Sequence, residues 1–360
     1  MIGGFLGAGK TTAVLAIAEQ LRARGFRVGL ITNDQSHGLV DTTMLAAHGF
    51  DVEEITGGCF CCKFNSLVDA SKRLSAQTRP DVFLAEPVGS CTDLKATVDY
   101  PLRRIYGNDF AVAPLSVMVD PTRAARILGL SEGSSFSKKV IYIYRKQLEE
   151  AEIIVVNKID LLPQDKVDEL LFALRREYPQ ASVLAVSAKK GSGVFSWLEA
   201  IESGVARTDG AMSVDYETYA EGEALLGWTN AAAAVDADDE FDGNALLLDI
   251  GQRLHQLIAA DGCEIAHLKL ALSPGEGNDL AVANLVGTGG TVEFSHKLES
   301  PLTDGELLIN LRAEADPDQL RQRVFEVISI PTIAGVRLKM LHLESFRPGK
   351  PTPTHRLAGV

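Results

Sequence analysis

Three of the five cysteines in this 360-residue chain fall within four positions, at Cys59, Cys61 and Cys62. Thiolates are good ligands for Zn²⁺ and for other borderline-soft transition-metal ions. Adjacent residues of a strand point to opposite faces, so Cys61 and Cys62 cannot both pack into one core, and a disulfide between neighbours is strained. We therefore interpret the C-x-C-C motif as a metal site, with a redox thiol and simple packing as the alternatives.

A second group of residues has the spacing of a phosphate-binding loop. In the pattern Gly4-x-x-x-x-Gly9-Lys10-Thr11, the glycines let backbone N–H groups point at phosphate oxygens at the N-terminus of the next helix. Lys10 is expected to reach the β- and γ-phosphates, and the Thr11 hydroxyl is expected to ligate Mg²⁺. The alternative is a glycine-rich turn before an ordinary helix. The residues predicted to bind the phosphates are Gly4, Gly7, Ala8, Gly9, Lys10, Thr11 and Thr12.

Two later segments indicate which base is bound. Asn157-Lys158-Ile159-Asp160 follows the apolar run 153–156, and Ser187-Ala188-Lys189 closes the run 183–187. Loops at the carboxyl ends of strands are where an α/β sheet binds its ligands. The Asp160 carboxylate can accept hydrogen bonds from the ring N–H and the exocyclic amino group of guanine, and adenine offers neither there. Each such bond is worth ~1.5–3 kcal/mol, so the sequence predicts selectivity for GTP.

Two carboxylates are candidates for the chemistry of hydrolysis beside Lys10. Glu86 ends the apolar run 82–85 and could hold Mg²⁺ through water or respond to the γ-phosphate. Asp41 could polarise the attacking water or contact the metal. As isolated acids, both would be interpreted as helix caps or solvated side chains. Lys10, Asp41 and Glu86 are the predicted catalytic residues.

The elements that must position these residues alternate between strands and helices over residues 1–205. The candidate strands are continuous apolar runs, as expected when helices cover both faces of a sheet. This pattern predicts a P-loop α/β domain with a doubly wound, mainly parallel sheet. The expected strands are 26–32, 82–85, 115–119, 153–156 and 183–187, and the expected helices include 10–24 and 165–177.

The pattern changes in the second half of the chain. A β-α-β-β-(β)-α-β order over residues 226–346 predicts a smaller C-terminal α+β domain of ferredoxin-like type. Residues 206–225 are expected to be an acidic linker, and residues 347–360 an extended tail. The expected strands are 226–235, 264–272, 279–287, 291–298, 306–313 and 336–344, and the expected helices are 244–260 and 317–328.

The net charge of −13 is concentrated in residues 208–252, which hold eleven acidic residues and no Lys or Arg. This segment is interpreted as a solvated linker or domain edge, with a docking surface for a basic partner as the alternative. The chain has no basic stripe, so we expect no nucleic-acid partner. We also expect no membrane span and no secretory signal, and therefore reduced thiols in the cytoplasm.

The combination of GGFLGAGKTT, GGCFCC, EPVG and NKID resembles the CobW-type GTPases, relatives of the nickel-insertion GTPases for urease and hydrogenase. The resemblance covers residues 1–205, and the second half is similar to the family's C-terminal domain with weaker motifs. It implies a GTP-driven metallochaperone or cofactor-insertion protein that uses GTP or GDP, Mg²⁺ and a transition metal, often Zn²⁺ or Co²⁺. It implies that the metal is bound chiefly through Cys61 and Cys62.

The chain departs from that family in three places. The family's first switch carries an acidic residue where this chain has His37, four residues before Asp41, and we predict His37 as a further metal ligand. The seven histidines are scattered, so metal storage is not expected. Only Met1 and Ile2 precede the phosphate-loop glycines, which suggests that Met1 is an internal methionine of a longer natural chain.

The sequence thus predicts a GTP-hydrolysing metallochaperone that delivers a transition metal to a client metalloprotein or a cofactor-pathway enzyme. The first alternative is a GTPase chaperone for a corrinoid or other cofactor-dependent enzyme, without transfer of free metal. The second is a regulatory GTPase whose thiols sense redox state. The sequence leaves open whether the protein forms a homodimer, and it specifies neither the metal nor the client.

Overall fold

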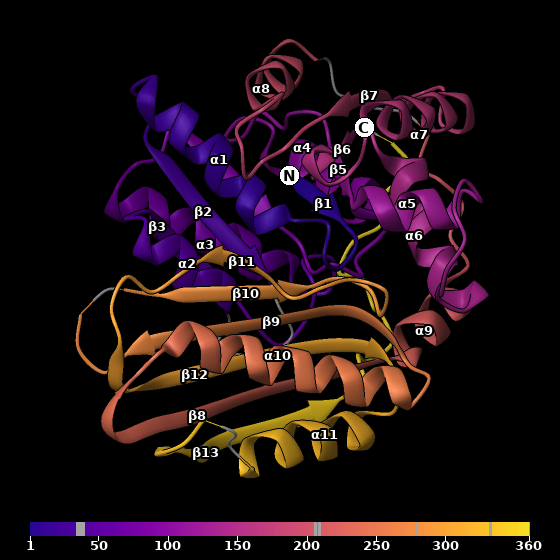
Figure 1. Cartoon of the computed structure of the whole chain (residues 1–360). Coiled ribbons are helices and arrows are strands. Elements are labelled where there is room, and N and C mark those ends of the chain that lie inside the picture. Colours follow the sequence, from indigo (N-terminus) through magenta and orange to yellow (C-terminus); the bar gives the residue numbers. More distant parts are fainter. Residues whose placement is uncertain (34–39, 205–206, 208–209, 278, 331–332, 360) are drawn as a thin grey trace. The chain divides into compact units, whose positions relative to one another are not determined.

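The computed structural model describes residues 1–33, 40–204, 207, 210–277, 279–330 and 333–359, and only the backbone of residues 41, 43 and 47 (Figure 1). The chain divides into two units. The first contains Met1–His37, His48–Gly222 and Lys350–Val360, and the second contains Gly38–Ala47 and Glu223–Gly349. Among the described residues, no helix is long and apolar enough to cross a membrane.

Two parallel sheets form the centre of the first unit. One has the strand order β1-β5-β6-β7, the other has the order β3-β2-β4, and β4 lies beside β1. The chain therefore extends from β1 in both directions, which is the predicted doubly wound arrangement. The strands are β1 (Ile2–Gly4), β2 (Val28–Asn33), β3 (Asp51–Ile55), β4 (Val82–Glu86), β5 (Ser116–Val119), β6 (Ile153–Val156) and β7 (Ser182–Ala185).

The sequence patterns predict β2, β4, β5, β6 and β7 but not β1 or β3. Strand β3 reads Asp-Val-Glu-Glu-Ile and pairs only with β2 among the described strands, so most of it is half-buried rather than covered on both faces. An edge strand does not need the continuous apolar sequence of a central one. Strand β1 has only three residues, which is too short for a pattern.

Helices connect these strands. Helix α6 follows helix α5, and a π-helical turn over Lys95–Asp99 leads into α4. The helices of the first unit are α1 (Lys10–Ala23), α3 (Phe64–Gln77), α4 (Tyr100–Tyr106), α5 (Pro121–Ile127), α6 (Lys138–Glu150), α7 (Gln164–Glu177) and α8 (Val194–Ser203); α9 (Tyr216–Leu225) begins in this unit.

The second unit is one antiparallel sheet with the order β11-β10-β9-β12-β8-β13. The strands β9, β12, β8 and β13, with a helix after β8 and another after β12, have the ferredoxin-like order that the sequence predicts. The elements are β8 (Leu226–Phe241), α10 (Gly243–Ala260), β9 (Glu264–Pro274), β10 (Ala281–Leu285), β11 (Glu293–His296), β12 (Leu302–Glu314), α11 (Pro317–Ser329) and β13 (Val336–Phe346).

The two faces of this sheet bury different partners. Leu268, Leu270 and Leu272 of β9 share one core with α10 and α11, which lie on the same side of the sheet in Figure 1. Ala271 points to the opposite face because side chains alternate along a strand. There it packs with Val40 of the short helix α2 (Val40–Ala47). The backbone N–H of Val40 donates to Asn310 Oδ1 at 3.2 Å.

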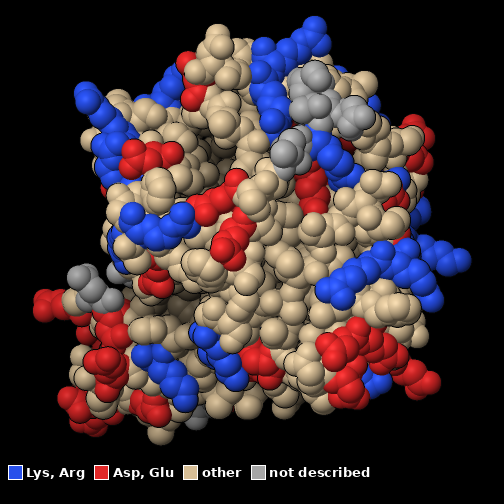
Figure 2. All heavy atoms as spheres, turned by 90° about the horizontal axis from the view of Figure 1, so that it is seen from above, with Lys and Arg blue, Asp and Glu red and all other residues tan. Residues whose placement is uncertain are grey.

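The acidic stretch is largely regular structure. Residues 216–225 form α9, and the Tyr219 hydroxyl donates to the Ser90 carbonyl at 3.2 Å. Strand β8 continues to Phe241, beyond its predicted end, because Asp236 and Asp238 pair with Arg337 of the neighbouring strand β13. On the face seen in Figure 2, Lys and Arg side chains are scattered among Asp and Glu rather than gathered in one basic area.

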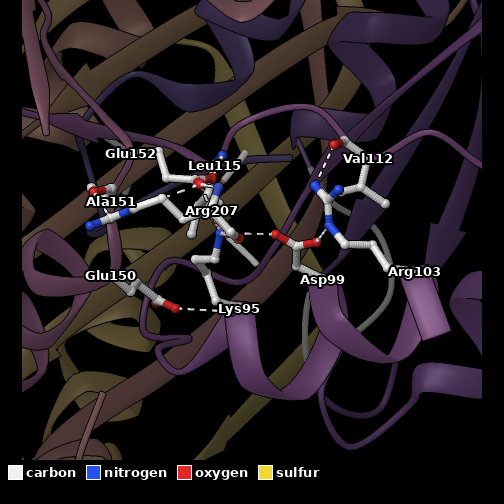
Figure 3. Close-up of polar contacts among 9 residues, drawn as sticks. All are labelled: Lys95, Asp99, Arg103, Val112, Leu115, Glu150, Ala151, Glu152 and Arg207. Atoms are coloured by element: carbon white, nitrogen blue, oxygen red, sulfur yellow. Dashed lines mark hydrogen bonds and ion pairs between the residues drawn. The ribbon is translucent and has the colours of Figure 1, made fainter. Parts of the chain in front are cut away.

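A buried cluster of charged side chains joins the turn before α4 to the start of β6 (Figure 3). Lys95 Nζ lies 2.8 Å from Glu152 Oε1 and 3.2 Å from Asp99 Oδ2, and all three side chains are buried. Asp99 also pairs with Arg103, and Glu152 accepts from the backbone N–H of Leu115 at 2.7 Å. Burial of charges is tolerated when each one is paired, so this cluster fixes the turn against the sheet.

Candidate nucleotide and metal site

The loop between β1 and α1 has the backbone that a phosphate-binding loop requires. Gly4, Gly7 and Gly9 have φ values of 130°, 79° and 84°, which disfavour any residue with a side chain. A Cβ at Gly4 would meet Met118 O at 2.3 Å, and one at Gly9 would meet Asn157 Nδ2 at 2.5 Å. Helix α1 then begins at Lys10, so the N–H groups of its first turn point toward the loop.

The two side chains that follow Gly9 are buried where the predicted carboxylate lies. Lys10 and Thr11 are 7% and 4% exposed. Thr11 Oγ1 donates to Glu86 Oε1 at 3.1 Å, and Glu86 is the last residue of β4. A hydroxyl and a carboxylate are hard oxygen donors of the kind that Mg²⁺ selects, so Thr11 and Glu86 fit the predicted Mg²⁺ site.

The loop after β6 is joined to the phosphate loop by two hydrogen bonds. Asn157 Nδ2 donates to Ala8 O at 3.0 Å, and Lys158 Nζ donates to Gly7 O at 2.7 Å. Lys158 adopts a left-handed backbone with φ of 55°. The predicted base loop therefore holds the phosphate loop by hydrogen bonds to its carbonyl oxygens, although the two loops are about 150 residues apart in the sequence.

The loop after β7 meets the same group of residues. Asn157 Oδ1 accepts from the backbone N–H of Ala188 at 3.0 Å, and Ser187 Oγ donates to Asp160 Oδ1 at 2.6 Å. Strands β6 and β7 are parallel neighbours, so their carboxyl ends place both loops at one edge of the sheet. Lys189 is exposed at the rim, and Thr12 is half-buried in the first turn of α1.

Asp120 belongs to this group and was not predicted. It follows β5, accepts from Lys158 Nζ at 3.0 Å and caps α5 through the N–H of Arg123 at 3.0 Å. Burial opposes its ionisation, but the charges of Lys158 and Arg123 outweigh burial, so the pKa of Asp120 lies below its usual value. Its position directly after an apolar run, like that of Glu86, was the signal in the sequence.

The three clustered cysteines lie in the turn between β3 and α3. The backbone N–H groups of Cys62 and Lys63 both donate to Cys59 O, at 3.0 and 2.9 Å, so the chain closes on itself just before Phe64 begins α3. This turn brings three sulfurs together: Sγ of Cys59 lies 2.7 Å from that of Cys61 and 3.3 Å from that of Cys62, and the last two are 3.7 Å apart.

One of these distances suits a soft metal ion, whereas the 2.7 and 3.3 Å separations of Cys59 are shorter than a tetrahedral zinc site has, so Cys59 would have to move away from the other two sulfurs on binding. Zn–S bonds of ~2.3 Å in a tetrahedral site imply sulfurs ~3.8 Å apart, and the 3.7 Å separation of Cys61 and Cys62 agrees with that value. Hydrogen bonding among the three thiols lowers the pKa of Cys59 and raises the pKa of Cys61 and of Cys62. Among the described residues, these are the only His, Cys, Asp or Glu side chains that converge as a metal cluster.

A fourth cysteine lies beside the cluster without joining it. Cys91 is buried in the loop after β4, and its hydrogen bond to Cys59 contributes to the lowered pKa of that thiol. No sequence pattern singles out Cys91, because it is isolated from the other three cysteines in the chain.

Two predicted residues are not brought into the site by the described part of the structure. His37 lies outside the described residues. Of Asp41 only the backbone is described, in α2, which belongs to the second unit. Their predicted roles stay predictions.

The chain is similar to a family profile and to several curated proteins. A family profile described as the CobW/HypB/UreG nucleotide-binding domain matches residues 1–185. The chain is 31% identical to zinc chaperone YeiR of Escherichia coli over 161 residues, which cover 44% of this chain and 46% of that protein. It is 28% identical to zinc chaperone CobW of Sinorhizobium over 183 residues, covering 45% of this chain and 51% of that protein. The chain thus spans about half the length of these curated relatives.

Solved structures are also similar. A hydrogenase maturation factor HypB from Archaeoglobus fulgidus has a TM-score of 0.40 at 20% identity, covering 56% of this chain and 86% of that chain. Zn(II)-bound YjiA GTPase from Escherichia coli has a TM-score of 0.34 at 14% identity, covering 91% and 97%. These scores are too low to support an inference. Because the family profile covers just over half of the residues, the chain belongs to the CobW/HypB/UreG family of nucleotide-binding domains.

Proposed function

We propose that this protein is a GTP-hydrolysing metallochaperone that carries a transition metal on Cys59, Cys61 and Cys62 and delivers it to a client. The observation that carries the proposal is the convergence of three sulfurs within 3.7 Å of one another in the same unit as a phosphate-binding loop. Zn²⁺ is the first cargo to test, because two similar proteins bear the name zinc chaperone, and Co²⁺ is the second.

The nucleotide half of the proposal rests on the loops after β1, β4, β6 and β7. Glycines with positive φ open the phosphate loop, and Lys10 lies at the start of α1. The Asp160 carboxylate accepts a hydrogen bond from Ser187 Oγ, and it is the group proposed to accept from the guanine edge. A relative from Dictyostelium discoideum, named zinc-regulated GTPase metalloprotein activator 1, is 23% identical over 238 residues, half of its length.

In the proposed reaction, water attacks the γ-phosphorus, the bond from that phosphorus to the bridging oxygen of the β-phosphate breaks, and GDP and inorganic phosphate leave. Lys10 and the loop N–H groups stabilise the charge that accumulates on the phosphate oxygens. Glu86 and Asp41 are the residues proposed to orient the water. Thr11 and Glu86 would hold Mg²⁺, which neutralises phosphate charge when it is bound.

The proposed partner is a client metalloprotein or a cofactor-pathway enzyme in the cytoplasm, where free thiols stay reduced. We expect no nucleic-acid partner, since the chain has a net charge of −13 and no basic stripe in its sequence.

The nucleotide assignment is tested by phosphate release from GTP and ATP. Wild-type protein should hydrolyse GTP in preference to ATP, and Lys10→Ala should lose ~10²-fold or more of the rate. Exposed Lys166→Ala in α7 is the matched control and should keep the wild-type rate. Equal rates for GTP and ATP would contradict the base assignment.

The metal assignment is tested by the metal content of protein purified without oxygen. Wild type should hold about one equivalent of metal, and Cys61→Ala should lose it. Cys263→Ala is the control, because Cys263 lies in the second unit and outside the cluster. Metal-free wild-type protein that retains GTP hydrolysis would favour the cofactor-enzyme chaperone or the redox switch instead.

A further inference from the structure

Residues 350–359 cross the cysteine turn of the first unit. The backbone N–H of Thr352 donates to Cys62 Sγ at 3.2 Å. Two residues later, Thr354 donates its N–H to Cys61 O at 2.9 Å and its hydroxyl to Cys62 O at 3.1 Å. Three hydrogen bonds from two threonines therefore hold the two cysteines Cys61 and Cys62.

The sequence of this segment accounts for its conformation. Pro351-Thr352-Pro353-Thr354 alternates prolines, which have no N–H and fix φ, with threonines, which supply the donors. In an extended chain alternate residues face the same side, so the N–H groups of Thr352 and Thr354 both point at the cysteine turn. The prolines also reduce the conformational entropy that the segment loses on docking.

Contacts after Thr354 fix the segment in place. The His355 ring meets the Phe64 ring edge-on, with centroids 4.9 Å apart, at the first residue of α3. Arg356 Nε lies 2.7 Å from the buried Asp93 Oδ2, and the backbone N–H of Leu357 donates to Ala96 O at 2.9 Å. The segment is therefore a built part of the first unit.

The three clustered cysteines differ in their exposure to solvent, and this difference indicates a role for residues 350–359. Cys59 and Cys61 are buried, at 7% and 1% exposed, whereas Cys62 is half-buried. An ion or a client ligand that approaches from solvent thus meets Cys62 first. That sulfur is the one that receives the hydrogen bond from Thr352.

We propose that residues Thr352–Thr354 are the outer wall of the metal site, and that the Thr352 N–H is a positioning group that orients Cys62 and slows metal release. This inference rests on the proposed metal-carrying function and adds a residue set to it. Hydrogen bonds to metal ligands fix their orientation, and removing such a partner typically weakens metal affinity ~10–100-fold.

The test compares Thr352→Pro with Thr352→Val in the full chain. Proline removes the N–H that donates to Cys62 Sγ and keeps the extended backbone, because residue 351 is already a proline. Valine keeps the N–H and has a similar size. Zn²⁺ affinity is measured by competition with a chelating dye, and the rate of Zn²⁺ release by trapping with excess chelator. The absorption spectrum of bound Co²⁺ reports the ligand geometry.

We expect Thr352→Val to match wild type, and Thr352→Pro to bind Zn²⁺ about 10-fold more weakly, release it faster and show a shifted Co²⁺ spectrum. In metal-free protein, protection of the buried Cys91 from iodoacetamide in both variants confirms that the fold is intact. Thr354→Val, which loses only the hydroxyl bond, should release Zn²⁺ faster than wild type.

The outcomes separate the two proposals. If wild type binds Zn²⁺ but Thr352→Pro and Thr352→Val agree in affinity, release rate and Co²⁺ spectrum, the proposed outer wall is wrong and the metallochaperone proposal stands. If wild type binds neither Zn²⁺ nor Co²⁺, both proposals are overturned.

Discussion

Thr11 Oγ1 donates a hydrogen bond to Glu86 Oε1 across 3.1 Å, which joins the first turn of α1 to the end of β4. The hydroxyl that is expected to ligate Mg²⁺ is therefore already held by a carboxylate from another strand. The two side chains are buried together, so they would hold Mg²⁺ beside the phosphate loop, where the ion would supply positive charge.

The first prediction follows from this pair. Glu86→Gln keeps an oxygen that accepts from Thr11 but removes the negative charge, so we expect GTP hydrolysis to slow ~10–100-fold with little loss of stability. Thr11→Ala should weaken Mg²⁺-dependent GTP binding, and Thr11→Ser, which retains the hydroxyl, is its control. Mg²⁺ titrations of the hydrolysis rate measure both effects, and an unchanged Mg²⁺ requirement in Thr11→Ala would argue against this metal site.

The second prediction concerns the base. Ser187 fixes Asp160 by a hydrogen bond of 2.6 Å, so its carboxylate can face the donors of guanine. Asp160→Asn replaces an acceptor by an amide donor, which suits the oxygen that xanthine carries at that position. We expect the variant to prefer XTP to GTP by ~10-fold or more, as measured by nucleotide competition. The exposed Asp165→Asn should keep the wild-type preference, and the base assignment fails if Asp160→Asn keeps it as well.

The parts of the site that lie in one contiguous segment could be predicted from the sequence. Glycine spacing predicted the phosphate loop around Lys10, and local crowding predicted the thiol cluster. The residues that were not predicted contact partners far away in the chain. Asp120 contacts Lys158, and Thr352 contacts Cys62. No local pattern encodes such pairs, because the fold alone brings them together.

The same limit applies to the buried charges and to the edge strand. Lys95 and Glu152 look like surface residues in the sequence, yet they form a buried pair 2.8 Å apart. Strand β3 is too polar to be recognised as a strand, because only the edge position permits three acidic residues in five. Likewise β8 continues through the acidic stretch, since Arg337 of the neighbouring strand β13 forms ion pairs with Asp236 and Asp238.

The third prediction links the nucleotide to the metal. If the γ-phosphate orders the segment that carries His37, the imidazole should become a ligand together with Cys61 and Cys62. GTP should then change Zn²⁺ affinity, and Zn²⁺ should change GTP affinity by the same factor, with a coupling of ~1–3 kcal/mol. The measurement is Zn²⁺ affinity by dye competition in GDP and in a non-hydrolysable GTP analogue. Equal affinities in wild type would separate the thiols from the GTP switch, and a nucleotide effect that persists in His37→Ala would exclude His37 as the ligand.

The last prediction concerns Glu150, the acid that ends α6 beside the buried charged cluster (Figure 3). Burial raises its pKa from 4.5 to about 8, although the N–H of Lys95 at 3.0 Å and the Thr92 hydroxyl at 3.4 Å favour the carboxylate. Between these two pH values the folded protein holds a proton that the unfolded chain has released. The free energy of unfolding must therefore fall as the pH rises through this window.

Glu150→Gln carries no titrating group, so it should lose this part of the pH dependence. We expect the stability of the variant relative to wild type to increase by roughly 3–4 kcal/mol between pH 5 and pH 8, measured by urea unfolding at both pH values. The exposed neighbour Glu149→Gln is the matched control and should follow wild type, because its side chain lies in solvent. A constant difference between Glu150→Gln and wild type across the window would mean that Glu150 is ionised in the folded protein, with Lys95 and Thr92 outweighing its burial.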